Sequence, residues 1–262
     1  MMGKTRIAAV LTPALAGVLL LSGSVFGAEI HVMSSGGFAA AYRALAPEFE
    51  RSTGHTLVTA WGPSMGATPE AVPARLQRGE PADVVIGVGS ALDKLIQQGR
   101  IVPGSRVDLA QSGIGVVVRA GAAKPDIGSI EAFKRTLLAA KSVAYSDSAS
   151  GVYLSTVLFQ RLGIADRMKG KSRMIPGEPV GAVVARGEAE IGFQQISELL
   201  PIAGIQMVGA LPPEVQLMTV FSAGIAAAAT QPEAGRALIR FLASPAAAPA
   251  IAKTGMEPLG SK

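Results

Sequence analysis

The chain has 262 residues, of which 49% are hydrophobic and 16% charged, and a formal net charge of +5. It contains no cysteine and two histidines, which excludes disulfides and thiolate chemistry and leaves little for a zinc or iron site. Basic residues are scattered singly and aromatic residues make up only 5%, a pattern that argues against nucleic-acid binding. We therefore expect a small-molecule partner, no nucleic acid, no metal and no cofactor. Any catalysis would then use carboxylates, Arg, Lys, Tyr, hydroxyl groups or the backbone.

Residues 1–27 are typical of a secretory signal peptide. Two basic residues precede an almost wholly apolar run over residues 7–21, and cleavage is expected just before Ala28. A membrane anchor is the alternative, but the apolar run ends at residues 22–24, somewhat short of the ~20 residues that a spanning helix needs. Export to the periplasm would leave a chain with 22 basic and 19 acidic residues, a net charge of +3.

The first part of the mature chain alternates short β-rich runs with helical patterns. The runs predict strands at residues 29–33, 56–61 and 83–86. Each is followed by a predicted helix, at residues 38–49, 71–78 and 90–98. Ser90 is expected to cap the third helix, with Asp93 in the capping-box position and Gly99 just after the end.

The second part repeats the alternation after a β-branched run at residues 114–118. Further strands are predicted at residues 143–145, near residue 174, and at residues 191–193 and 215–228. Helices are predicted at residues 130–140, 151–162, 179–186, 232–242 and 246–253. Two chain crossings, near residues 110–120 and 205–225, would join the two units. We expect an α/β fold with two lobes that form a clamp, built on mostly parallel sheets flanked by helices. The expected lobes comprise residues 28–112 with 222–262, and residues 113–221.

Three turns rich in glycine and serine lie where a predicted strand passes into a predicted helix: residues 34–37, 62–66 and 147–151. Such turns lie at the carboxyl ends of strands in an open α/β sheet, where backbone N–H groups, small hydroxyls and helix dipoles favour a bound anion. Any one of them can also be an ordinary turn or N-cap. Together they predict one anion site in a cleft between the lobes.

Four blocks carry a resemblance to a known family: residues 30–38, 79–86, 148–153 and 185–193. In these blocks the chain resembles the type 2 periplasmic solute-binding proteins, in the branch that includes the molybdate-binding proteins. The resemblance implies an oxyanion-type site held by hydroxyls and by backbone N–H groups at helix starts. Carried over onto this sequence, it implies substrate contacts from Ser34, Ser35, Gly36, Gly37, Ser64, Ser148, Ser150, Gly151, Val180, Gln194 and Gln195.

At Gln195 that family has a tyrosine, and at Gly37 it has a serine. An amide can donate two hydrogen bonds to a carboxylate, so the replacement is consistent with a larger organic acid. Residues 147–153 and 192–198, the chain length and the signal peptide resemble the bacterial periplasmic aconitate isomerases. This implies isomerisation of trans- and cis-aconitate, a tricarboxylate, by a monomer. The alternative is a binding protein that delivers a carboxylate or a molybdate-like oxyanion to an ABC permease.

Isomerisation of aconitate needs positive potential for the carboxylates and one acid–base group. Arg119, at the end of a buried strand, is the candidate guanidinium, although it can equally be a solvated strand-end residue. Glu178, Tyr153 and Asp147 are the candidate proton carriers. Each has a structural alternative: an acid at a helix start, a core aromatic residue and a helix cap, respectively. The two histidines, at positions 31 and 55, are expected at the surface, away from the cleft.

Overall fold

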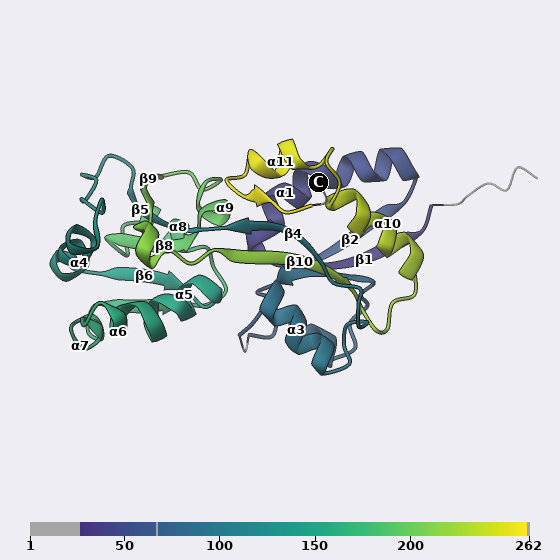
Figure 1. The fold of residues 1–262 in the computed structure, drawn as a ribbon, viewed down its shortest axis with the longest axis horizontal. Coiled ribbons are helices and arrows are strands. Elements are labelled where there is room, and N and C mark those ends of the chain that lie inside the picture. The colour runs from purple at the N-terminus through teal and green to yellow at the C-terminus, as the bar shows by residue number, and fades with distance from the viewer. Residues whose placement is uncertain (1–26, 67, 261–262) are drawn as a thin grey trace, which may run out of the picture.

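The computed structural model describes residues 27–66 and 68–260, so nearly all of the predicted signal peptide lies outside the described residues. Two lobes lie side by side and are joined by long strands that run from one into the other (Figure 1). Each lobe is built on one β-sheet. We call the elements of the six-stranded sheet and its helices the first lobe, and those of the five-stranded sheet the second lobe.

The first sheet has the strand order β11-β4-β10-β3-β1-β2. Its strands are β1 Glu29–Ser34, β2 Thr56–Trp61, β3 Val84–Val88, β4 Val107–Ser112, β10 Thr219–Ile225 and β11 Glu257–Pro258. Its helices are α1 Gly36–Thr53, α2 Val72–Gln77, α3 Gly89–Gln97, α10 Pro232–Leu242 and α11 Ala248–Ala252. Helices α1, α10 and α11 cover one face and α3 covers the other (Figure 1).

The second sheet has the strand order β7-β6-β8-β5-β9. Its strands are β5 Ile114–Arg119, β6 Val143–Ser146, β7 Ser172–Ile175, β8 Ile191–Gln195 and β9 Ile205–Ala210. Its helices are α4 Ile130–Ala139, α5 Ala149–Tyr153, α6 Phe159–Arg161, α7 Ala165–Met168, α8 Val180–Ala185 and α9 Ile196–Leu199. A π-helical segment, Leu154–Leu158, connects α5 to α6, and a 3-10 turn, Pro213–Val215, precedes β10.

The expected two-lobed α/β fold is confirmed, but the expectation of mostly parallel sheets is wrong, because each sheet mixes parallel and antiparallel pairs. Strands β1, β2 and β3 pair in parallel, as do β6, β7 and β8, because each belongs to a strand–helix–strand unit. The remaining pairs are antiparallel, because β4, β5, β9 and β10 belong to the two crossings between the lobes. The lobe boundaries given above stay a prediction.

Helix α1 illustrates how the apolar pattern builds the core. Its buried residues include Phe38, Tyr42, Leu45 and Phe49, which recur at helical spacing and pack against the first sheet. Fully burying a side chain of this size contributes about 1.5–3 kcal/mol. The second lobe has a separate apolar cluster that includes Phe133, so the two lobes have separate cores.

Two local expectations are wrong. Helix α3 begins at Gly89 with Val88 as its N-cap, so Ser90 lies inside the helix and does not cap it, and Asp93 pairs with Arg106 at 2.6 Å. The strand expected over residues 215–228 is shorter, since prolines at positions 212 and 213 hold the chain in a 3-10 turn before β10 begins.

Asp83 is a buried carboxylate that ties three segments together. It is 1% exposed and accepts hydrogen bonds from the backbone N–H groups of His31 at 2.8 Å, Thr230 at 2.7 Å and Gln231 at 2.8 Å. These bonds connect β1, the start of β3 and the entry to α10. Buried polar groups of this kind are stable only when hydrogen-bonded, so Asp83 is structural.

Candidate functional site

The first two turns lie side by side at the carboxyl ends of β1, β2 and β3. The Gly62 N–H donates to the Ser34 carbonyl at 3.2 Å, and the Ser64 hydroxyl accepts from the Val88 N–H at 2.9 Å. Ser34 and Ser64 are both buried. Since β1 pairs in parallel with both β2 and β3, their ends bring these turns together as the sequence predicted.

The third turn reaches the same place from the second lobe. Gly66 faces Asp147, because a Cβ atom at Gly66 would lie 4.0 Å from the Asp147 carboxylate. Ala149 packs against the core of the first lobe. Behind it, the hydroxyls of Ser146 and Ser150 are 2.9 Å apart. Ser148 is the N-cap of α5 without a side-chain capping bond, and Gly151 packs so closely on the Ser146 carbonyl that no Cβ fits. The structure therefore brings the three turns to one junction.

The start of α1 presents hydrogen-bond donors that its own cap does not use. Ser35 is the N-cap, but its hydroxyl makes no capping bond, is 3% exposed and has no partner among the described residues. By contrast, Ser129 at the start of α4 accepts the Ala132 N–H at 3.1 Å. Helix α1 has 18 residues, so its free N–H groups and dipole favour an anion at this end.

Two neighbouring amides at the end of β8 have different roles. Gln194 accepts the Val180 N–H at 2.9 Å, so this predicted backbone donor is already paired. Gln195 is fully buried and donates to the Thr219 hydroxyl at 2.9 Å, while its Oε1 has no partner in the described part of the chain. A hydroxyl can accept or donate, so the Gln195 amide can turn and offer either its oxygen or its NH2 group.

Glu198, which the sequence analysis did not select, faces the start of α1. A methyl group at Gly36 would overlap its Oε1 atom. Burial raises the pKa of Glu198 to about 7, and the negative charge of Asp147 also raises it, while hydrogen bonds from the Gln194 side chain and the Gln195 backbone oppose the shift. The carboxyl can therefore hold or release a proton near neutral pH.

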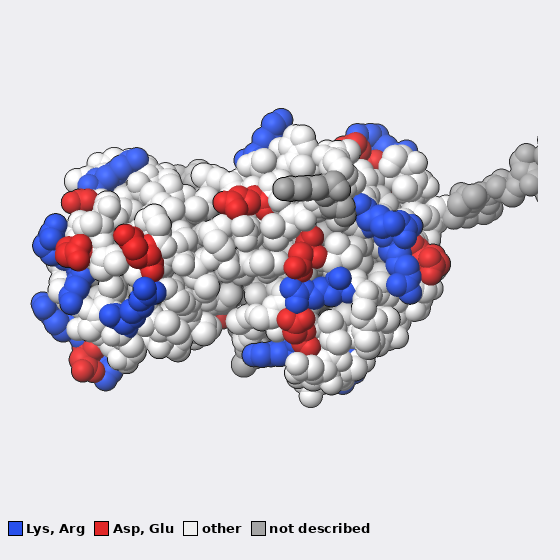
Figure 2. Space-filling model, in the orientation of Figure 1, with Lys and Arg blue, Asp and Glu red and all other residues white. Residues whose placement is uncertain are grey.

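We call Ser35, Gly36, Asp147, Gln195 and Glu198 the interlobe site. Its two halves are held together by a hydrogen bond from the Ser197 hydroxyl to the Gly37 carbonyl at 2.8 Å. The surface is indented between the lobes on the side of α3 and α5, and on this face charged side chains gather over the outer parts of both lobes (Figure 2).

The structure places Arg119 away from the interlobe site, which corrects the expected position. Strand β5 leaves the junction at Ile114, which pairs with Gln195, and runs antiparallel to β8. Arg119 at its far end pairs with Ile205, is exposed and lies beside Gly187. The strand ends at the outer edge of the lobe because its direction is opposite to that of β8.

The other two predicted catalytic side chains have partners in the protein. Tyr153 donates its hydroxyl to the Val215 carbonyl at 2.8 Å and packs against the core of the second lobe. Glu178 is exposed and forms a two-point ion pair with Arg186, with distances of 3.0 and 3.1 Å. The adjacent Gly177 N–H donates to Asp147 at 3.3 Å, so the Glu178 loop lies next to the junction.

The two histidines lie away from the turns, as expected, but both are half-buried and not fully at the surface; His31 lies in the first half of β1 and His55 directly before β2. His31 Nε2 is 3.2 Å from a Glu29 carboxylate oxygen. His55 Nδ1 accepts the Ala28 N–H at 2.9 Å. Both therefore lie at the opposite end of β1 and β2 from the turns.

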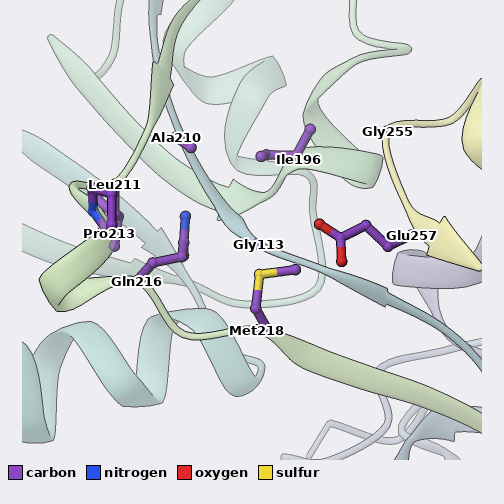
Figure 3. Close-up of a pocket in the computed structure, with 9 residues that line it drawn as sticks. All are labelled: Gly113, Ile196, Ala210, Leu211, Pro213, Gln216, Met218, Gly255 and Glu257. Atoms are coloured by element: carbon purple, nitrogen blue, oxygen red, sulfur yellow. The ribbon is translucent and has the colours of Figure 1, made fainter. Parts of the chain in front are cut away.

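A separate cavity of about 430 Å³ lies at the crossing strands and not at the turns (Figure 3). Its lining is mostly apolar, and the side chains of Met218 and Glu257 face each other across it with Ile196 beside them (Figure 3). The interlobe site contains polar atoms without a described hydrogen-bond partner and free N–H groups at a helix start, and a ligand can form hydrogen bonds with both. The apolar cavity offers fewer such groups, so the interlobe site is the better candidate for a polar ligand.

Comparisons with known proteins agree with this fold. A family model described as bacterial extracellular solute-binding protein matches residues 30–257. An aconitate isomerase from a Pseudomonas species is 53% identical over 252 residues, covering 95% of this chain and 96% of the relative. The molybdate-binding protein ModA of Azotobacter vinelandii is 28% identical over 191 residues, covering 70% and 71%. The solved periplasmic molybdate-binding protein of Azotobacter vinelandii has a TM-score of 0.68 at 22% identity, covering 87% and 98%.

Proposed function

We propose that this chain, which belongs to the bacterial extracellular solute-binding protein family, is an aconitate isomerase that interconverts trans- and cis-aconitate. The observation that carries the proposal is the 53% identity to an aconitate isomerase over 95% of this chain. The match is nearly complete in both chains, so it includes both lobes. The molybdate-binding relative matches at much lower identity.

The interlobe site has groups suited to a tricarboxylate. The free N–H groups at the start of α1 and the unpartnered Ser35 hydroxyl can bind one carboxylate. The Gln195 amide, turned so that its NH2 group is free, can bind a second. We assign three of the other predicted contacts, Ser64, Ser148 and Ser150, to the positioning of the turns around the substrate.

The reaction moves a C=C bond by an allylic proton shift. A proton leaves the methylene carbon next to the carboxylated alkene, and a proton is added two carbons away, so an extended anion forms between the two steps. Fixed donors and helix dipoles at the junction stabilise that charge without solvent reorganisation. Accordingly the activity needs no metal and no cofactor.

We further propose that the protein acts in the periplasm as a monomer, after removal of residues 1–27. The signal-peptide pattern and membership of an extracellular solute-binding family support export. In the parts of the chain that the structure describes, no helix is long and apolar enough to cross a membrane.

A second function is favoured by the family match itself. Solute-binding proteins share this fold with enzymes, so the same site could capture a carboxylate or a molybdate-like oxyanion and deliver it to an ABC permease. That reading assigns binding and no turnover to the interlobe site.

One experiment separates the two functions. Purified mature protein, treated with a chelator, is incubated with trans-aconitate, and formation of the cis isomer is followed by proton NMR. Metal-independent formation of cis-aconitate supports the isomerase. Tight binding of aconitate or molybdate without turnover, measured by calorimetry on the same sample, would replace it with the transport function.

A further inference from the structure

We propose that Glu198 is the acid–base residue that carries the proton between the two carbons of aconitate, an assignment that rests on the proposed function. The carboxyl faces the start of α1, among polar atoms that the protein leaves without partners. This places a proton carrier directly beside the groups assigned to the substrate carboxylates.

The geometry carries the assignment. The Glu198 carboxyl lies so close to Gly36 that a methyl group there would overlap its Oε1. Gly36 begins α1 and follows Ser35, whose buried hydroxyl is unpartnered among the described residues. On its other side, Gln195 has a buried amide oxygen without a described partner. The Gln195 backbone also hydrogen-bonds the Glu198 carboxyl, so this carboxyl lies between the segments that carry the two unpartnered atoms.

The lack of a side chain at position 36 has a chemical consequence. Any larger residue would occupy the space in which Glu198 meets the helix start. Glycine therefore lets the Glu198 carboxyl come close to the start of α1, beside the backbone donors that can bind a substrate carboxylate. The same donors favour the charge that develops on the substrate, so base and substrate lie within one electrostatic environment.

The surroundings of Glu198 suit an acid–base residue. Burial raises its pKa to about 7, and the Asp147 carboxylate, the charged group that acts on it from the β6–α5 turn, raises it further, against hydrogen bonds from Gln194 and Gln195. A pKa near the working pH gives both protonation states appreciable populations. An ordinary exposed carboxyl would be too weak a base to take a carbon-bound proton efficiently.

The proposed step balances without a co-reactant. The Glu198 carboxylate takes a proton from the methylene carbon, and the electron pair of that C–H bond forms the new C=C bond with the central carbon. The former π electrons spread over the other terminal carbon and its carboxylate. The Glu198 carboxyl then returns a proton to that terminal carbon, which becomes the new methylene group, and the residue is a carboxylate again.

The three candidates that the sequence predicted as proton carriers are less well placed. Glu178 is exposed and paired with Arg186, so its carboxylate is already neutralised at the surface. Asp147 accepts the Gly177 N–H and holds the neighbouring loop. The Tyr153 hydroxyl donates its hydrogen bond to the Val215 carbonyl.

The test compares Glu198→Gln with wild type. Since positioned acid–base groups contribute typically about 100- to 10,000-fold, we expect kcat to fall by at least about 100-fold. Calorimetric binding of trans-aconitate should change by less than about threefold, which shows that the variant is folded and binds. Glu198→Asp keeps the carboxyl, set back by one methylene, and should recover part of the lost turnover together with the pH dependence of kcat/KM.

Glu233→Gln is the matched control, because Glu233 is an exposed acid on α10, and it should turn over like wild type. If wild type turns over and the kcat of Glu198→Gln lies within threefold of the wild-type value, the assignment of Glu198 is overturned, but the proposed isomerase function is not. Loss of turnover in Glu178→Gln instead would move the role to that carboxyl. Absence of turnover in wild type overturns the proposed function, and the assignment with it.

Discussion

Replacing Gly37 with alanine should both destabilise the protein and weaken substrate binding. Gly37 lies in the first turn of α1, against the ring of Phe221 in β10. An alanine Cβ would overlap the Cε1 and Cζ atoms of that ring, and Cε2 would be only 3.0 Å away. Carbon atoms in contact prefer about 3.5–4.0 Å, so the ring would have to shift.

The ring has little room for that shift, because Phe221 is 2% exposed and belongs to the core of the first lobe. Overpacking of a core typically costs about 1–3 kcal/mol, and alanine returns up to about 1 kcal/mol through its better helix propensity. We expect a net loss of about 1–2 kcal/mol in the free energy of unfolding. For a chain of this size Tm should fall by roughly 2–8 °C.

The assay is thermal unfolding followed by circular dichroism, with KM for trans-aconitate measured on the same samples. KM should rise, since the Gly37 segment begins the helix whose donors bind the substrate. Gly170→Ala is the matched control, because nothing described lies within 4 Å of a Cβ there, and its Tm should stay near that of wild type. If Gly37→Ala kept both the Tm and the KM of wild type, the close packing of α1 on β10 would not position the site.

Three further outcomes are expected. Asp83→Ala leaves three backbone N–H groups without their acceptor, so the free energy of unfolding should fall by about 3 kcal/mol or more in urea denaturation, and a loss below 1 kcal/mol would contradict the structural role. Between pH 4.5, the ordinary pKa of a glutamate, and about pH 7, Glu198 keeps its proton in the folded chain but loses it in the unfolded chain. The contribution of Glu198 to the free energy of unfolding is therefore lost as the pH rises through this window. Glu198→Gln should therefore be more stable than wild type above pH 7, on the order of 1–3 kcal/mol, and lose that advantage near pH 4.5, whereas a pH-independent difference would argue against the raised pKa. Arg119→Ala should leave KM for aconitate within about twofold, because the side chain is exposed at the far end of β5, and a tenfold rise would return it to the site.

The sequence alone was sufficient for the repeating units and the turns between them. Strand-to-helix alternation is local, since it depends on apolar periodicity and on small residues at the junctions. The turn at residues 34–37 could be placed at a strand's carboxyl end for the same reason, and parallel pairing of β1, β2 and β3 then brings it beside the turn at residues 62–66. The buried face of α1 followed from the spacing of Phe38, Tyr42 and Leu45.

The direction of the crossing strands could be decided only by the tertiary structure. Arg119 ends a β-branched run in the sequence, and such a run looks the same whichever end faces the junction. Because β5 pairs antiparallel with β8, Ile114 lies at the junction and Arg119 at the outer edge. Strand order arises from long-range pairing, which no local pattern encodes.

The sequence did contain a signal for Glu198, an acidic residue in the first turn of a helix that begins directly after Gln195. By itself that signal is ambiguous, because an acid at a helix start most often only interacts with the dipole. Glu178, which directly precedes the N-cap of α8, carries a similar local signal but lies exposed in an ion pair, while Glu198 faces Gly36 from the other lobe. Asp147, whose charge raises the pKa of Glu198, and Gly36, which the Glu198 carboxyl faces, are both distant from it in the chain, so only the folded structure distinguishes the two carboxyls.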